Sequence, residues 1–275
     1  MASPLRFRSA FTLIELLVVI SIIALLIGIL LPALGAARNS ARDMACLSNQ
    51  RQIGVGLYGF AQENDDLLPV SYYDGGGNAA DITDWGVLIA SYMNQGAADS
   101  YGQGGRDQAS PGLQCQSAAV EGGRLHYGAN MLIMPLSVGG GTAFGLTQYR
   151  LSYMQRTTEI LFVADGTQTT NPEANQSFGE TYAALDWLDA SGADSAADYY
   201  TSTAVDNNDP IAPGLNADGD LLAAGAPGRD LRWRHGSGDK SNGSDDGSVN
   251  ALFGDGHASI NQRDALLKRN VRADR

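Results

Sequence analysis

The N-terminal part of the chain carries a long, continuous hydrophobic pattern. No residue between Glu15 and Arg38 is charged, so 22 consecutive uncharged residues extend from Leu16 to Ala37. At 1.5 Å per residue this segment would be about 33 Å long as a helix, enough to cross a hydrocarbon core of about 30 Å. The pattern predicts a single membrane span over residues 16–37.

Beyond this span the pattern becomes amphipathic, which predicts that the helix continues. Apolar residues recur at steps of three and four: Leu34, Ala37, Ala41, Met44 and Leu47. The helix is expected to end near Ala61 or Glu63, because Asn64-Asp65-Asp66 and Pro69 follow. Residues 11–63 are therefore predicted to form one N-terminal helix.

The remaining residues, 64–275, combine short apolar runs with glycine-rich and acidic loops. Strands are predicted at Gln148–Met154, at Glu159–Ala164, and at Val249–Gly254 with a return at His257–Ile260. Asp255-Gly256 between two apolar runs is a strong hairpin signal, in which both turn residues are expected to take positive φ. The predicted fold is α+β, with an antiparallel meander packed on the long helix and long Gly/Asp-rich loops.

The charge of the chain excludes a broad class of partners. Lys and Arg number 18 against 30 Asp and Glu, a formal net charge of -12, so the globular part has no basic surface for nucleic acid. The two cysteines, Cys46 and Cys115, permit one disulfide and argue against a multi-cysteine metal site. Two reduced, buried thiols are the alternative.

Candidate catalytic and zinc-binding residues are few. His235, Asp255 and His257 would have to converge with another ligand to hold zinc, and the chain has only 3 histidines. We interpret them instead as hairpin residues hydrogen-bonded to a nearby loop. Ser237 lies in no Gly-x-Ser-x-Gly elbow, so an enzyme is not expected.

One acidic loop is a candidate calcium site. Asn216, Asp218 and Asp220 surround Gly219 and supply part of a calcium-binding loop, without the distal Glu of an EF-hand. The alternative is a solvated acidic loop.

The first residues combine a basic leader with an acid in an apolar run. Arg6 and Arg8 precede FTLIELL, whose Glu15 is unusual because a carboxylate at the centre of a membrane helix costs about 2.5 to 3.5 kcal/mol. These residues resemble the type IV prepilin and pseudopilin signature. A secretory signal cut near residues 34–37 and an uncut membrane anchor are the alternatives.

The resemblance implies processing and assembly. A membrane-embedded prepilin peptidase would remove the leader, residues 1–10, between Ala10 and Phe11, and Phe11 would be methylated. Most relatives have Gly where this chain has Ala10. Glu15 and Pro32 would then be residues 5 and 22 of the mature chain, where the family places these residue types. The Glu15 carboxylate would meet the N-terminal amine of a neighbouring subunit in the filament.

The globular part is similar to the prepilin-type family named for a histidine, a spacer and an Asp-Gly pair. The matching blocks are CLSNQRQIGVGLYGFAQENDDLLP, LQC, HYGAN, TEILFVADG, RHG and ALFGDGHASI. The spacer between His235 and Asp255 has 19 residues rather than nine, and residues 167–228 match nothing in the family, which predicts an insertion.

These resemblances imply a structural subunit of a type IV pilus or a type II secretion pseudopilus. Its expected partners are copies of itself, the prepilin peptidase, the assembly machinery and the inner membrane. It would be a single-pass inner-membrane protein with an extracytoplasmic head, and then a filament in the periplasm or on the cell surface. Major pseudopilins bind calcium in a head loop, which favours the calcium site. The alternative function is a membrane-anchored binding or adhesion protein that does not polymerise.

Overall fold

The structure is a computed structural model. It describes residues 12–74, 83–93, 111–118, 125–130, 132–138, 141–142, 148–166, 184–185, 208, 210–211, 231–236, 247–262 and 264–271. The chain consists of two compact units, residues 1–41 and 42–275, and the boundary between them lies inside the first helix.

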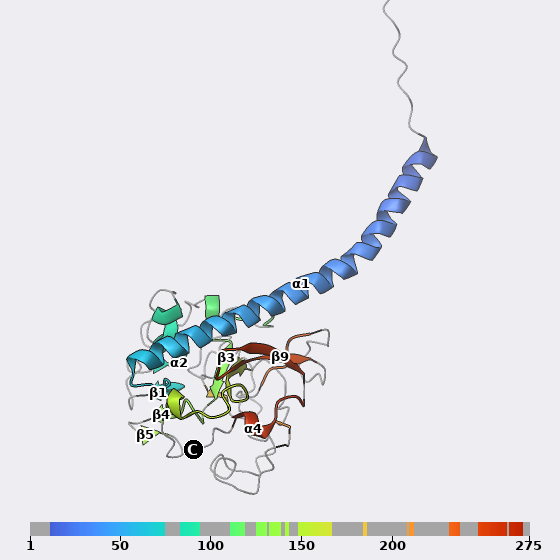
Figure 1. Cartoon of the computed structure of the whole chain (residues 1–275). Helices are drawn as coiled ribbons and strands as arrows, with labels where there is room; N and C mark the ends of the chain where they lie inside the picture. The colour runs from blue at the N-terminus through green and yellow to red at the C-terminus, as the bar shows by residue number, and fades with distance from the viewer. Residues whose placement is uncertain are drawn as a thin grey trace, which may run out of the picture. The chain divides into compact units, whose positions relative to one another are not determined.

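The first helix, α1, extends from Leu13 to Glu63 and continues through Pro32, as the sequence predicts (Figure 1). By length and composition alone, it can cross a membrane. The helix ends where Asp65 and Asp66 take positive φ values of 53° and 67°. The N–H of Asp66 then donates to the carbonyl of Ala61 at 2.9 Å, which satisfies one of the last helical carbonyls.

A five-stranded sheet forms the centre of the second unit, in the order β7-β3-β6-β8-β9. Its strands are β3 (Tyr127–Asn130), β6 (Leu161–Asp165), β7 (Ala184–Leu185), β8 (Ser248–Phe253) and β9 (Ala258–Gln262). Strands β3, β6, β8 and β9 pair antiparallel, whereas β7 pairs parallel to β3. The antiparallel meander and the α+β class are therefore confirmed.

A second sheet of four strands was not predicted, since its strands are too short to show a periodic pattern. It has the order β2-β1-β4-β5. The strands are β1 (Tyr72–Asp74), β2 (Thr83–Asp84), β4 (Leu136–Val138) and β5 (Gly141–Thr142). The short helices are α2 (Trp85–Ile89), η2 (Ala90–Met93), η4 (Pro111–Leu113), η6 (Leu151–Tyr153) and α4 (Lys268–Val271).

The part of α1 from residue 42 onward packs on the meander (Figure 1). Its buried apolar side chains, Cys46, Leu47, Ile53 and Leu57, join one core cluster with Tyr127, Val163 and Leu252. Of the five apolar residues in the predicted amphipathic pattern only Leu47 is buried. Met44 is 57% exposed, and Leu34, Ala37 and Ala41 are exposed as well, so the pattern did not identify the packing face of α1. Gly54 faces the sheet instead, and a Cβ there would lie 3.1 Å from Leu252 Cδ1, so this glycine permits the close approach.

The predicted strand Gln148–Met154 was wrong. Residues 151–153 form the 3₁₀ turn η6, and only Arg150 makes an isolated bridge, to Leu67. The reason is local: the N–H of Tyr153 donates to the carbonyl of Arg150 and that of Met154 to Leu151, so these groups pair within the turn. A neighbouring strand cannot use them.

The predicted hairpin between β8 and β9 is confirmed, but its turn differs from the expectation. Of the two turn residues only Gly256 has positive φ, 86°, and Asp255 does not. The N–H of Gly256 donates to the carbonyl of Phe253 at 2.9 Å, so the turn covers four residues and needs one left-handed position.

Candidate functional site

The start of α1 is a capping box formed by Thr12 and Glu15. The backbone N–H and the hydroxyl of Thr12 both donate to Glu15 Oε2 at 2.8 Å, and the N–H of Glu15 donates to Thr12 Oγ1 at 3.2 Å. These bonds satisfy donors that a helix N-terminus otherwise leaves unpaired. This role of Glu15 was not predicted, although the Thr-x-x-Glu spacing is typical of a capping box. Ala10 and Phe11 lie outside the described residues.

The apolar segment of α1 is exposed along its whole length. Every residue from 12 to 41 is exposed, and Leu13, Leu25 and Leu31 are between 62% and 80% accessible. The one hydroxyl near its middle, Ser21, donates to the carbonyl of Leu17 at 2.7 Å. A surface this apolar indicates contact with a membrane or another protein.

The disulfide between Cys46 and Cys115 is formed, which confirms the oxidised alternative. It joins α1 to the segment after η4, with 5.0 Å between the two Cα atoms, and both side chains are buried. Two further contacts support this connection: Asn49 Nδ2 donates to the carbonyl of Gln114 at 2.9 Å, and Ser117 Oγ donates to Asp43 Oδ1 at 2.9 Å.

Next to the disulfide, His235 lies between two buried carboxylates. Its Nδ1 is 2.6 Å from Asp43 Oδ1, and its Nε2 is 2.9 Å from Asp165 Oδ2. The N–H of Gly236 also donates to Asp43 Oδ2 at 3.2 Å, and the N–H of Asn250 to Asp165 Oδ2 at 2.9 Å. The Asp43–His235–Asp165 cluster thus connects α1, β6 and the segment bonded to β8.

The electrostatics of this cluster favour a charged His235. Burial by itself lowers the pKa of His235, but the charge of Asp165 and the hydrogen bonds of Asp165 and Asp43 outweigh it, so the pKa is raised. For Asp43, burial by itself raises the pKa of the carboxyl group. Its hydrogen bonds to His235, Gly236 and Ser117 and the charge of His235 outweigh the effect of burial, so the pKa of Asp43 is lowered. An imidazolium between two carboxylates is therefore the favoured state of the folded chain.

The three residues considered for zinc or hydrolysis do not form one site. His235 belongs to the buried cluster, whereas His257 Nδ1 lies 2.5 Å from Asp255 Oδ1 on the exposed hairpin. The His257 ring also stacks on Phe253, with 4.5 Å between ring centroids. Asp255 and His257 are hairpin residues, as interpreted from the sequence. The same interpretation was wrong for His235, which bonds to Asp43 and Asp165, two residues distant in sequence, and not to a nearby loop.

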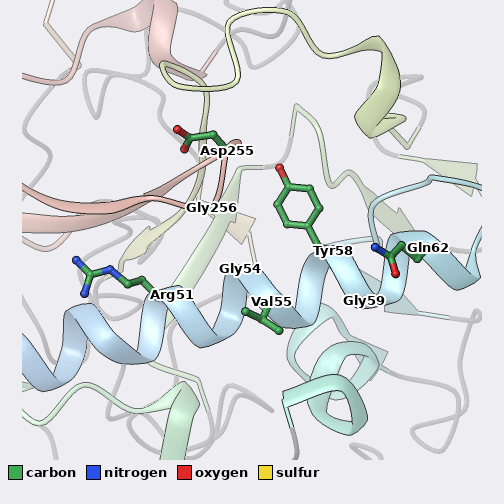
Figure 2. Close-up of a pocket in the computed structure, with 8 residues that line it drawn as sticks. All are labelled: Arg51, Gly54, Val55, Tyr58, Gly59, Gln62, Asp255 and Gly256. Carbon is green, nitrogen blue, oxygen red and sulfur yellow. The ribbon is translucent and has the colours of Figure 1, made fainter.

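A shallow hollow of about 430 Å³ lies where α1 meets the hairpin turn. Figure 2 shows Tyr58 rising from α1 toward the turn that carries Asp255 and Gly256, and the Tyr58 hydroxyl donates to the carbonyl of Gly254. Burial and the nearby Asp255 charge raise the pKa of Tyr58, so it stays a neutral donor. We assign this contact a structural role in holding the turn on α1.

The predicted calcium ligands Asn216, Asp218 and Asp220 lie outside the described residues, as does most of the predicted insertion at 167–228. Two described pieces of that insertion pack on the second unit. Strand β7 pairs with β3, and Ile211 is buried with its N–H donating to the carbonyl of Leu266 at 2.9 Å.

Asp43 and Asp165 were not predicted as functional residues, although the sequence around each contains a signal. Asp43 is one helical turn before Cys46, on the same face of α1. Asp165 follows the apolar run LFVA directly, where a charged residue at the end of a buried strand calls for a partner.

Comparison with known families agrees with the resemblance seen in the sequence. Residues 5–31 match the prokaryotic N-terminal methylation motif, and residues 35–119 match a family described as protein of unknown function (DUF1559). No curated protein and no solved structure matches the chain. The two matches support a prepilin-like or pseudopilin-like protein.

Proposed function

We propose that this chain is a structural subunit that polymerises through its N-terminal helix into a type IV pilus or a type II secretion pseudopilus. The observation that carries the proposal is the exposed apolar segment of α1, most of which lies within the match to the N-terminal methylation motif at residues 5–31. In the membrane this surface contacts lipid, and in a filament it contacts the same segment of other copies. The proposed work is assembly rather than catalysis.

Leader removal is the first step of the proposal. The prepilin peptidase would cleave the Ala10–Phe11 bond on the cytoplasmic side, and Phe11 would be methylated. Such a cut leaves the capping box intact, because all of its donors and acceptors lie at Thr12 and Glu15. Mass analysis of the N-terminal peptide from assembled material tests this step. A mature start at Ala36, or an intact Met1, would contradict it.

After the cut, Glu15 has two roles that experiment can separate. It caps α1 within its own subunit, and its charge is available to the N-terminal amine of a neighbour, where pairing at low dielectric offsets the cost of burying an ion. Glutamine at this position retains an oxygen for the capping box and loses the charge, while valine loses both.

The experiment compares Glu15→Gln and Glu15→Val with the parent for filament yield, with membrane insertion and leader cleavage as controls. If the charge pairs with a neighbour, both variants insert and are cleaved but give few filaments. Normal filaments from Glu15→Gln together with few from Glu15→Val would assign Glu15 to capping alone. A processed but monomeric parent chain would favour the non-polymerising anchored binding protein.

Calcium binding by the head is a secondary part of the proposal, supported by the spacing of Asn216, Asp218 and Asp220 around Gly219. Binding to the folded state alone stabilises it by about 2.7 kcal/mol at a hundredfold excess over the dissociation constant. The full chain in detergent should melt higher in calcium than in chelator. Equal melting temperatures would reject the site, and a shift that survives Asp218→Ala and Asp220→Ala would place calcium elsewhere.

A further inference from the structure

Three donor atoms typical of transition-metal sites lie together beneath α1. Cys46 Sγ, Cys115 Sγ and a ring nitrogen of His235 are all within 4.8 Å of one another. The residues are 0%, 3% and 1% exposed. Cys115 Sγ is 3.6 Å from His235 Nε2, so this ring nitrogen faces the sulfur pair. Two thiolates and an imidazole are a ligand set that zinc prefers.

Asp165 lies beside this group. It is not among the donors that lie within 4.8 Å of one another, so its carboxylate has to turn away from His235 Nε2 to become a fourth ligand. Its Oδ2 lies 2.9 Å from His235 Nε2, and among the described residues its buried Oδ1 has no hydrogen-bond partner. An unpaired carboxylate oxygen in a fully buried side chain is costly, and a bound cation would satisfy it. Four donors of mixed sulfur, nitrogen and oxygen type are enough for a tetrahedral site.

Asp43 is placed to orient the histidine ligand. Its Oδ1 lies 2.6 Å from His235 Nδ1, the nitrogen that faces away from the sulfurs. This contact holds the proton on Nδ1 and leaves Nε2 directed at the sulfurs and Asp165. A carboxylate behind a metal-binding histidine is the usual support of such ligands, because it fixes the ring and raises its basicity.

We propose that the chain, when the Cys46–Cys115 disulfide is reduced, binds one Zn²⁺ through Cys46, Cys115, His235 and Asp165. The disulfide and the metal site exclude each other, since both use the same two sulfurs. The oxidised chain therefore has a crosslink between α1 and the segment after η4, and the reduced chain has a metal at the same place. This inference does not depend on polymerisation.

The change between the two states balances with a dithiol as reductant. Two electrons and two protons pass to the sulfurs of Cys46 and Cys115, and the reductant leaves as its own disulfide. Zn²⁺ then displaces three protons to solvent, one from each thiol and one from Nε2 of His235, and takes the place of the Nε2 proton. At a Zn–S distance of about 2.3 Å the sulfurs of a tetrahedral site are roughly 3.8 Å apart. Rotation of the two side chains at a Cα–Cα distance of 5.0 Å provides this separation.

The test uses the full chain in detergent and Co²⁺ as a spectroscopic substitute for Zn²⁺. The chain is unfolded, reduced with a dithiol, freed of the reductant without oxygen, and refolded with Co²⁺, because the buried site requires loading during folding. We expect one Co²⁺ per chain, thiolate-to-cobalt absorption, the strong visible bands of tetrahedral cobalt, and their loss when Zn²⁺ is added. The oxidised chain should show none of these bands.

Matched variants separate the site from nonspecific thiol binding. His235→Ala should lose the tetrahedral spectrum, while His257→Ala, which removes the exposed histidine, should keep it. Cys115→Ser should lose the stoichiometric binding, with circular dichroism confirming that the helix is retained. A refolded, reduced parent chain that takes up no Co²⁺ would overturn the proposal, and so would an unchanged spectrum in folded Cys115→Ser.

Discussion

Replacing His235 with alanine removes the group that separates two buried carboxylates. Asp165 is 0% exposed and Asp43 is 6% exposed, so neither can recover its hydration without unfolding part of the second unit. Removal of one partner from a buried ion pair typically costs about 3 to 5 kcal/mol, because an uncompensated charge stays behind. We expect a loss of this size for His235→Ala.

The matched control is His257→Ala. Its side chain is 45% exposed, and its partner Asp255 is 31% exposed, so water replaces the lost contact. A pair of this kind is worth less than about 1 kcal/mol. Both substitutions remove a histidine from contact with aspartate. His235 is buried between two carboxylates, whereas His257 is exposed, contacts one carboxylate and stacks on Phe253.

The assay is thermal unfolding of the full chain in detergent at pH 6, with the disulfide intact and a chelator present. For a unit of this size 1 kcal/mol corresponds to about 2 to 4 °C, so His235→Ala should lower Tm by about 6 to 20 °C. Adding Asp165→Asn should restore part of the loss, since it removes one stranded charge. A decrease in Tm for His235→Ala no larger than that for His257→Ala would refute the charge-burial explanation. If the double variant is as unstable as the single one, the cost comes from packing rather than charge.

Three further predictions concern the second unit. Replacing Cys46 and Cys115 by serine should lower the free energy of unfolding by about 4 kcal/mol in the chain-entropy account, because the disulfide closes a loop with a sequence separation of 69. If the oxidised and the reduced parent chain unfold at the same denaturant concentration, this prediction is wrong. The raised pKa of His235 contributes stability that is fully present below its unfolded pKa of 6.5 and is lost as pH rises through the higher folded pKa. The lowered pKa of Asp43 contributes stability that is present above its unfolded pKa of 3.8 and is lost as pH falls through the folded pKa. The Tm of the parent and that of His235→Ala should therefore differ most between about pH 4 and 6.5, and parallel curves of Tm against pH would refute this prediction. In denaturant titrations Gly247→Ala should lower the free energy of unfolding far more than Gly256→Ala. Both glycines have positive φ, but a Cβ at Gly247 would lie 2.2 Å from the Trp233 carbonyl oxygen. Equal decreases in the free energy of unfolding would show that backbone strain alone determines the effect.

The local features of this protein followed from short stretches of sequence. The uncharged segment at 16–37 predicts a helix by its length and composition, and the polar run after Glu63 predicts its end, because both depend on residues close in the chain. Asp255-Gly256 predicts a hairpin for the same reason, although only tertiary packing decided that the turn has one left-handed residue instead of two. Short strands such as β1 and β5 carry too few residues for any pattern to predict them.

The buried cluster was decided by tertiary structure alone. His235 meets Asp43 across a sequence separation of 192 and Asp165 across a separation of 70, so no periodic pattern links the three positions. Two cysteines in one chain permit a disulfide, but only the approach of α1 to the segment after η4 brings the sulfurs together and places His235 beside them. Hydrophobic periodicity specifies which face of an element is buried. The partner of a buried charge depends on which distant segment covers that face, and that is decided only when the whole core packs.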